Sequence, residues 1–217
     1  DISCLYFDER TMNPILSYRR GMVYVDGKRL KQVRTYRELG LNKGAFWVEE
    51  DGLCLHVRLE DDGNPADHVV EITTKEQVFA PEKPYLGYIR VKGLTLEFAG
   101  NGNPVPQKGL LSTYRGHHWI IEDNVIRHAN SVGIDAGNEC WNACPPPPDF
   151  SHHIIRRNVI SDCGVCGIAA IKSEYMLIED NLIENIGWQR VYYSWESAGV
   201  KVHEAKNMMF RRNVVRK

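Results

Sequence analysis

The sequence lacks several features that would assign it to a broad class. Its 217 residues contain no apolar run of about 18 residues, so we expect no membrane span. The formal net charge is -1, which gives no electrostatic reason to expect nucleic acid as a partner. The chain starts at Asp1 without a secretory-signal pattern, so we expect a mature chain or a piece of a longer one. No signal names a compartment, and a bacterial cytoplasm or periplasm is favoured.

The sequence contains six cysteines, which are unevenly placed. Cys140 and Cys144 lie four positions apart, and Cys163 and Cys166 lie three apart, a spacing that superficially resembles a zinc-thiolate set. In the repeat described below, a strand of about 15 Å separates Cys140 from Cys166. We therefore expect free thiols, with a Cys140–Cys144 disulfide as one alternative and structural zinc as the other. No cofactor and no metal are predicted.

Helical periodicity is missing from the second half, which instead carries a repeat centred on asparagine. Two or three apolar residues precede two charged ones, then asparagine, then two apolar residues. The copies are WIIEDNVI (Trp119 to Ile126), HIIRRNVI (His153 to Ile160), MLIEDNLI (Met176 to Ile183) and MMFRRNVV (Met208 to Val215). A weaker copy, YIRVKGLT (Tyr88 to Thr95), has Gly93 at the asparagine position. The shortest step, from Asn158 to Asn181, is 23 residues.

A repeat of this length with strands of about five residues predicts a right-handed parallel β-helix. Each coil would add one rung, and successive rungs lie about 4.8 Å apart. The repeated asparagines would stack at one bend, where their side chains tolerate left-handed backbone and bond to the backbone and to each other. This ladder is expected to be structural rather than catalytic, and its members are Asn124, Asn158, Asn181 and Asn213.

The first half contains hairpin patterns instead. VYVDGKRL (Val23 to Leu30) has an Asp-Gly turn between strand-like runs, and AFWVEEDGLCLHVRLEDDG (Ala45 to Gly63) has Asp51-Gly52 at its tip. Alternation in LCLHVRL favours a sheet with one buried face. We predict a small antiparallel β-sandwich over residues 1–80, a linker at Phe79–Pro84, and pectate-lyase-like β-helix coils over 85–217. A short turn at Tyr36–Leu39 is the nearest approach to a helix.

The second strand of each coil predicts a functional face. VGIDAG, CGIAAI and AGVKVH align from Val132, Cys166 and Ala198, and alternate residues of a strand point to opposite faces. Two outward columns follow, one of Asp135, Ala169 and Lys201, and one of Gly137, Ile171 and His203 with Glu204 beyond it. Asp135 and Lys201 would lie two rungs apart, roughly 10 Å. The small Ala169 between them predicts a solvent-facing groove floor.

Two aromatic insertions are expected to border this groove. WQRVYYSWE begins at Trp188 and contains Trp195, and NECWNACPPPPDF (Asn138 to Phe150) contains Trp141. Aromatic rings beside carboxylates and a histidine suit a sugar, whose C–H face stacks and whose hydroxyls take hydrogen bonds. The predicted substrate-binding residues are Asp135, Lys201, His203, Glu204, Trp188, Trp195 and Trp141. The alternative is that the aromatics cover the coil beneath them and the charged residues are solvated or paired.

The histidine pairs of the repeat have another expected role. His117-His118 recurs as His152-His153 at the equivalent turn. Repetition at one turn favours stacking over metal binding, which would require side chains of adjacent rungs to converge.

Several phrases together resemble right-handed β-helix glycoside hydrolases, in particular glycoside hydrolase family 120, the β-xylosidase-like enzymes. These are VYVDGKRLKQV, ITTKEQVFAP, the segment from Tyr88 to Gly137, and SAGVKVHEAKN. The resemblance implies a β-sandwich with a parallel β-helix, a site on the helix surface, and action on plant-type oligosaccharides. It also implies a retaining mechanism with two carboxylates about 5–5.5 Å apart. His203-Glu204 looks like the family's substrate-contacting pair, and the catalytic carboxylates are expected beyond Lys217.

The end of the sequence gives a further expectation. A β-helix ending at MMFRRNVVRK would leave an uncovered strand edge, whereas solenoid ends need caps. We therefore expect a fragment, incomplete at its C-terminus and weak in catalysis alone, whose partner is the remainder of its own β-helix or a second copy. The rival functions are a polysaccharide lyase, suggested only by Lys201 near Asp135, and a non-catalytic glycan-binding module. The fold alone does not decide between them.

Overall fold

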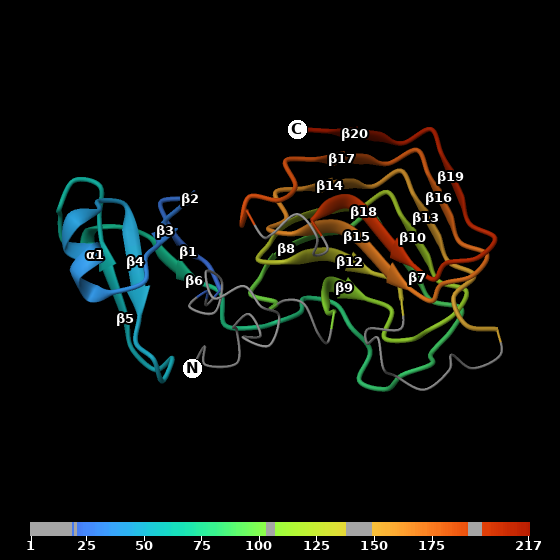
Figure 1. Ribbon diagram of the computed structural model, residues 1–217, viewed down its shortest axis with the longest axis horizontal. Coiled ribbons are helices and arrows are strands. Elements are labelled where there is room, and N and C mark those ends of the chain that lie inside the picture. The colour runs from blue at the N-terminus through green and yellow to red at the C-terminus, as the bar shows by residue number, and fades with distance from the viewer. Residues whose placement is uncertain (1–18, 20, 103–106, 138–148, 191–196) are drawn as a thin grey trace.

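The fold is all-β, as the sequence predicts. The computed structural model describes residues 19, 21–102, 107–137, 149–190 and 197–217. In these ranges twenty strands are accompanied by one α-helix, α1 (Tyr36–Leu41), and one 3-10 turn, η2 (Pro65–Asp67). Strands β7 to β20 form a parallel β-helix, and the earlier strands form two small sheets beside it (Figure 1).

Three parallel sheets make up the β-helix, and each coil adds one strand to each sheet. The first sheet contains β7 (Arg90–Lys92), β10 (Ile120–Glu122), β13 (Ile154–Arg156), β16 (Leu177–Glu179) and β19 (Met209–Arg211). The second contains β8 (Thr95–Ala99), β11 (Val125–Ala129), β14 (Val159–Ser161), β17 (Leu182–Glu184) and β20 (Val214–Arg216). The third contains β9 (Gly109–Ser112), β12 (Val132–Asp135), β15 (Cys166–Ile171) and β18 (Ala198–His203).

The interior of the coils is filled by stacked aliphatic side chains. In the first sheet Ile121, Ile155 and Ile178 occupy the same position on successive rungs, and all three are fully buried. Burial of one such side chain stabilises the fold by about 1.5–3 kcal/mol. Equivalent stacks run through the other sheets, Ile126–Ile160–Ile183 in the second and Ile134–Ile168 in the third, and belong to the same core cluster. The apolar positions of the repeat therefore form one continuous core.

The asparagine ladder is confirmed. Asn124 Nδ2 donates to Asn158 Oδ1 at 3.0 Å, and Asn158 Nδ2 donates to Asn181 Oδ1 at 3.0 Å. Asn181 Nδ2 continues to Asn213 Oδ1 at 2.9 Å. Each asparagine oxygen also accepts a backbone N–H from the preceding rung, as Asn158 Oδ1 does from Asn124 N at 3.1 Å. The ladder therefore satisfies the polar groups at the bend between the first and second sheets.

One detail of the predicted ladder is wrong. The left-handed backbone lies on the residue before each asparagine, with φ of 56° at Asp123 and 52° at Arg157. In the first coil Lys92 pairs with Glu122, so Gly93 takes the place of Asp123 and not the asparagine place. Gly93 has φ of 71°, which glycine adopts without steric cost. Leu94 stands at the asparagine place and donates its N–H to Asn124 Oδ1 at 3.0 Å.

The two charged residues of each repeat alternate in sign from rung to rung. Glu-Asp at 122–123 lies between Arg-Arg at 156–157 and the earlier Arg90 and Lys92. Glu122 is buried and accepts hydrogen bonds from Arg90, from Arg156 at 2.7 Å and from Arg157 at 2.8 Å. These guanidinium groups lower the pKa of the Glu122 carboxyl to about 2. The alternation therefore places opposite charges on adjacent rungs.

The turn between the third and first sheets carries a stack of rings. Tyr88, His118, His152 and Tyr175 follow one another with centroid separations of 5.0, 4.8 and 4.9 Å. The predicted stacking role of the histidine turn is confirmed for His118 and His152. In register His153 is equivalent to Trp119, and its Nδ1 accepts the Trp119 N–H at 3.1 Å.

The N-terminal strands form two three-stranded sheets. One holds β1 (Val23–Val25), β2 (Lys28–Arg29) and β6 (Val70–Ile72), and the other holds β3 (Lys31–Gln32), β4 (Ala45–Val48) and β5 (Leu55–Arg58). Both predicted hairpins are present, and Asp26 and Gly27 have the positive φ of a type I′ turn, 48° and 74°. Strands β3 and β4 are parallel and α1 is added, so the antiparallel β-sandwich is not confirmed.

The predicted linker begins inside the β-helix. Phe79 forms a parallel bridge with Leu111 of β9, and its ring packs edge-on against Trp119 at 6.4 Å. The Phe79 side chain packs against the core of the first coils. The predicted linker at FAPEKP does not account for this packing. The division into domains at 1–80 and 85–217 remains a prediction.

Side chains of the small sheets contact the β-helix at two places. Tyr24 packs edge-on against Phe98 at 5.0 Å, and Phe98 stacks on His128 at 5.1 Å. Arg29 lies 3.6 Å from the centroid of the Trp188 ring. The last described coil carries half-exposed apolar side chains, which are Met209, Phe210, Val214 and Val215.

Candidate functional site

The third sheet brings together the column predicted to face a sugar. Asp135 of β12 pairs with Ala169 of β15, and Ala169 pairs with Lys201 of β18. His203 pairs with Ile171 in the adjoining column. The aligned second strands therefore have the predicted register, and Asp135 and Lys201 stand two rungs apart. Sequence reasoning missed Ser112 of β9, which extends the column below Asp135.

The expectation that Asp135 faces solvent is wrong. Its side chain is fully buried, and Oδ1 accepts the Gly137 N–H at 2.8 Å. Gly137 is itself tightly packed, because a Cβ there would lie 2.2 Å from Ile171 N. Ala169 is also fully buried and belongs to a second apolar cluster with Val132, Val165 and Cys166. This part of the sheet is a packed layer, so it is not an open groove floor.

The accessible part of the site lies on and just after β18, the last described strand of the third sheet. Lys201 and His203 are half-buried on β18, and Glu204 is exposed directly after it. Glu204 has φ of 51°, which marks a sharp turn at the end of the strand. The His203 carbonyl accepts the Lys172 N–H at 2.7 Å, which joins this turn to the coil below. An amine, an imidazole and a carboxylate thus lie within four consecutive residues.

Of the three predicted aromatic platforms, the structure describes Trp188. Its indole Nε1 donates to the Asp162 carbonyl at 3.0 Å, and the Arg29 guanidinium covers one ring face. This cation–π contact joins β2 to the β-helix. Trp188 therefore has a structural role, and a role in sugar stacking stays a prediction. Trp141 and Trp195 lie outside the described residues.

Of the four thiols whose spacing resembles a zinc set, the structure describes Cys163 and Cys166, and these lie in different apolar clusters. Cys163 belongs to the inner core, while Cys166 lies in the second cluster and donates to the Ile168 carbonyl at 3.2 Å. Both are free thiols, and burial raises the pKa of Cys163 to about 12. A zinc site needs thiolates that converge. Cys140 and Cys144 lie outside the described residues.

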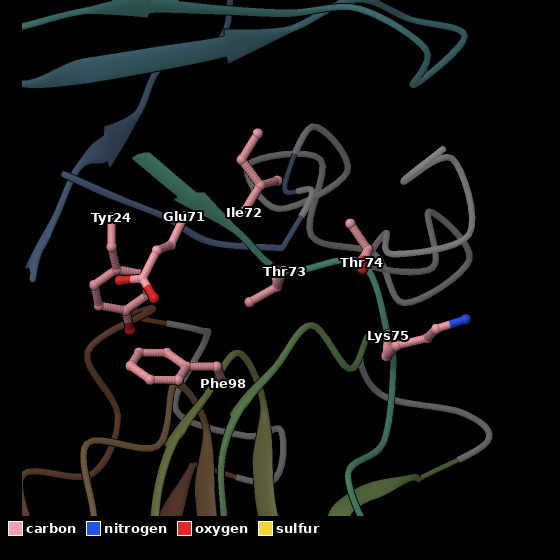
Figure 2. Close-up of a pocket in the computed structure, with 7 residues that line it drawn as sticks. All are labelled: Tyr24, Glu71, Ile72, Thr73, Thr74, Lys75 and Phe98. Carbon is pink, nitrogen blue, oxygen red and sulfur yellow. The ribbon is translucent and has the colours of Figure 1, made fainter. Parts of the chain in front are cut away.

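Among the described residues, two of the hollows lie in or beside the small sheets. Figure 2 shows one of about 190 Å³, lined by Tyr24, Glu71, Thr73 and Phe98 among others, where the end of β6 meets the β-helix. The other, of about 510 Å³, includes Asp26 and His68 in its lining. No sequence motif predicted either hollow, because the residues that line each one come from segments far apart in the chain.

The larger hollow contains a paired histidine. His68 Nδ1 lies 2.7 Å from Asp26 Oδ2, and Asp61 Oδ2 lies 3.7 Å from Nε2. The hydrogen bond to Asp26 raises the pKa of His68 and lowers that of Asp26. This pair was not predicted.

The described residues also include one cluster of metal-ligating side chains. One group of histidine, cysteine and acidic side chains has the spacing of a metal site, and it consists of Glu49, Cys54 and His56. In the same part of the chain no helix is both long and apolar enough to cross a bilayer.

Comparisons with known proteins agree with this architecture. No curated protein matches the sequence. A solved structure described as "The complex structure of XylC with xylose" matches with a TM-score of 0.76 and 24% sequence identity. The match covers 90% of this chain and 39% of the other, so this chain spans well under half the length of that protein. The family described as "Right handed beta helix region" matches residues 107–217. The chain therefore belongs to the right-handed β-helix family.

Proposed function

We propose that this chain is part of a carbohydrate-active protein, a β-xylosidase-like retaining glycoside hydrolase of the family 120 type that acts on plant-type oligosaccharides. The observation that carries the proposal is the likeness over 90% of the chain to XylC, a protein whose structure was solved with xylose. The sequence phrases that resemble family 120 point in the same direction. A sequence identity of 24% shows a shared fold and not a shared activity. The enzymatic activity is therefore part of the proposal.

The proposed sugar site is the end of the third sheet. His203 and Glu204 would take hydrogen bonds from sugar hydroxyls, and Lys201 would donate to a ring or glycosidic oxygen. Asp135 is not proposed as a direct sugar contact, because it is fully buried and its carboxylate accepts the Gly137 N–H. Trp188, Trp195 and Trp141 are the proposed stacking platforms.

The proposal assigns sugar binding to this chain and leaves the catalytic pair unassigned. A retaining mechanism needs two carboxyl groups about 5–5.5 Å apart, close to the spacing of neighbouring rungs. Asp135 and the Glu204 region belong to coils two rungs apart, because Ala169 stands between Asp135 and Lys201. That separation is roughly 10 Å, so these two residues are not proposed as nucleophile and acid.

The test is titration of the chain with xylose and xylobiose, followed by heteronuclear NMR, with p-nitrophenyl β-xyloside hydrolysis measured in parallel on the whole protein of which the chain is proposed to be a part. His203→Ala and Glu204→Gln are expected to weaken binding by at least about tenfold, the cost of a lost hydrogen bond to a charged group. The controls are His68→Ala and Glu184→Gln, which remove the same groups elsewhere and should leave binding unchanged.

Each outcome of this test has a definite meaning. Failure of every glycan tested to shift resonances of β18 would overturn the proposal. Binding by this chain, with no turnover of any glycoside by the whole protein of which it is proposed to be a part, would favour the glycan-binding module over the hydrolase. A product with a new double bond, or activity lost with a chelator, would favour the polysaccharide lyase.

A further inference from the structure

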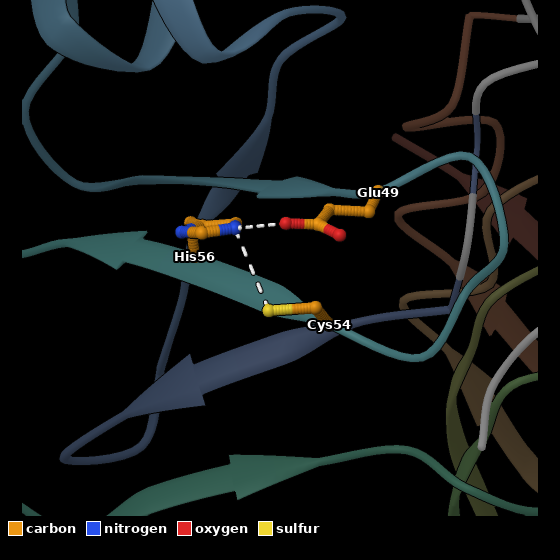
Figure 3. A group of neighbouring side chains, drawn as sticks. All are labelled: Glu49, Cys54 and His56. Carbon is orange, nitrogen blue, oxygen red and sulfur yellow. Dashed lines mark hydrogen bonds and ion pairs between the residues drawn. The ribbon is translucent and has the colours of Figure 1, made fainter.

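The tip of the β4–β5 hairpin carries three metal-ligating side chains on one face. Trp47 pairs with His56 across the two strands, and the Glu49 N–H donates to the Cys54 carbonyl at 3.0 Å. Side chains two positions apart on a strand share a face. Glu49 therefore stands beside Trp47, and Cys54 stands beside His56, on the same side of the hairpin. Figure 3 shows the three side chains pointing toward one another.

The distances between the donor atoms suit a tetrahedral zinc ion. His56 Nε2 lies 2.8 Å from Glu49 Oε1 and 3.5 Å from Cys54 Sγ. Zn–N and Zn–O bonds of about 2.0–2.1 Å and a Zn–S bond of about 2.3 Å place tetrahedral N and S ligands about 3.5 Å apart. The same geometry places N and O about 3.3 Å apart. The thiol therefore already stands at ligand distance, and the carboxylate needs to withdraw by only about 0.5 Å.

The surrounding structure holds the imidazole in place. Its ring stacks on Trp47 with centroids 5.0 Å apart, and Tyr36 of α1 packs edge-on against it at 5.3 Å. The turn between the ligands is closed by the Gly52 N–H, which donates to the Glu49 carbonyl at 2.9 Å. A ring fixed before the metal arrives loses little conformational entropy on binding. The site is thus built into the hairpin.

We propose that Glu49, Cys54 and His56 bind a zinc ion at the tip of this hairpin, with a fourth position open to water or to an external ligand. The donor set selects zinc over magnesium or calcium, because a thiolate and an imidazole are soft or borderline ligands whereas those ions take oxygen ligands. The side chains of Glu49 and His56 are 40% and 33% exposed, and Cys54 is exposed, so an ion can enter from solvent.

Proton release is an expected accompaniment of binding. An ordinary cysteine thiol has a pKa of about 8.5 and is mostly protonated at neutral pH. Zinc takes the thiolate, and binding must release that proton. Affinity should therefore increase as the pH rises.

The test uses Co²⁺ and Zn²⁺ with the whole chain. One Co²⁺ per chain should produce a thiolate-to-cobalt charge-transfer band in the near ultraviolet, and Zn²⁺ should abolish it by displacement. Cys54→Ser should remove the band, while Glu49→Gln and His56→Gln should weaken binding by at least about tenfold, as loss of a ligand typically does. The matched controls are Glu50→Gln, an exposed neighbour with the same change of charge, and His68→Gln, and both should bind like the unaltered chain.

A second measurement does not depend on the variants. Zn²⁺ should protect Cys54 from iodoacetamide, as read by peptide mass spectrometry, and thermal melts without metal should show that Cys54→Ser is folded. A charge-transfer band that survives in Cys54→Ser would place the metal at other thiols and overturn the proposal. Equal losses in Glu49→Gln and Glu50→Gln, or alkylation of Cys54 at an unchanged rate in zinc, would overturn it as well.

Discussion

Replacing Asn158 by alanine tests whether the asparagine ladder stabilises the β-helix. Asn158 is 1% exposed, and its side chain makes four hydrogen bonds. Nδ2 donates to the Ile121 carbonyl at 2.9 Å and to Asn181 Oδ1 at 3.0 Å. Oδ1 accepts from Asn124 N at 3.1 Å and from Asn124 Nδ2 at 3.0 Å. The substitution therefore removes the hydrogen-bond partner of buried polar groups on Ile121, Asn124 and Asn181.

The expected loss follows from the number and burial of these bonds. A typical intramolecular hydrogen bond contributes about 1 kcal/mol, and an unsatisfied buried group costs about 1–3 kcal/mol. We therefore expect Asn158→Ala to lower the free energy of unfolding by about 4 kcal/mol. Asn213→Ala removes the same type of side chain at the last described rung, where the residue is only half-buried. Water can satisfy the partners there, so its cost should be about 1–2 kcal/mol.

Urea unfolding followed by tryptophan fluorescence gives both values, and the two variants must share the m-value of the unaltered chain for the comparison to hold. A loss of less than about 1 kcal/mol for Asn158→Ala would refute the account, because that is the contribution of a single ordinary bond. Equal losses of unfolding free energy in Asn158→Ala and Asn213→Ala would refute the argument that burial of the hydrogen-bond partners raises the cost.

Two further predictions concern the core of the coils. Gly167→Ala should lower stability by about 1–3 kcal/mol, because the new methyl group would meet the Gly199 carbonyl at 2.5 Å and Ile183 Cγ2 at 2.8 Å. Gly40→Ala, in α1 with open space around it, should instead raise stability by about 0.5–1 kcal/mol, and thermal melts of the pair compare them. Burial lowers the pKa of His153 from 6.5 to about 3, so the folded state excludes a proton that the unfolded chain binds. The neutral, buried His153 contributes its full stabilisation above pH 6.5, and this contribution falls as the pH drops toward 3. In urea unfolding, the free energy of unfolding of His153→Asn should therefore decline less steeply over that pH window. Parallel curves for the two proteins would contradict this assignment.

The repeat was predictable because its period maps directly onto rungs. Aligning Asn124, Asn158 and Asn181 fixes which residues share a column, and the observed pairing of Asp135 with Ala169 follows from that alignment. The Asp26-Gly27 hairpin was predictable because two consecutive positive φ angles favour those residue types. The misplaced Gly93 shows the limit, since glycine and asparagine both occur where the backbone is left-handed.

The rest depended on contacts that no local pattern contains. The burial of Asp135 follows from the packed layer around Ala169, whose members come from two coils. The cover over Trp188 comes from Arg29, which lies in a different sheet. The hairpin cluster did carry a signal, because Glu49 and Cys54 flank the Asp-Gly turn with His56 two positions beyond. The alternation of side chains along the two strands, counted from the turn, would have predicted that the three side chains lie on one face.

The alternating charges on the first sheet restrict how such a chain can lengthen or shorten. Glu-Asp rungs at 122–123 and 179–180 are each followed by an Arg-Arg rung, at 156–157 and 211–212. Deleting a single coil would stack like charges on like and bury one carboxylate against another. The asparagine ladder would tolerate that deletion, since four successive coils carry the same residue, Asn124, Asn158, Asn181 and Asn213. Adding or removing two adjacent coils would instead keep opposite charges on neighbouring rungs.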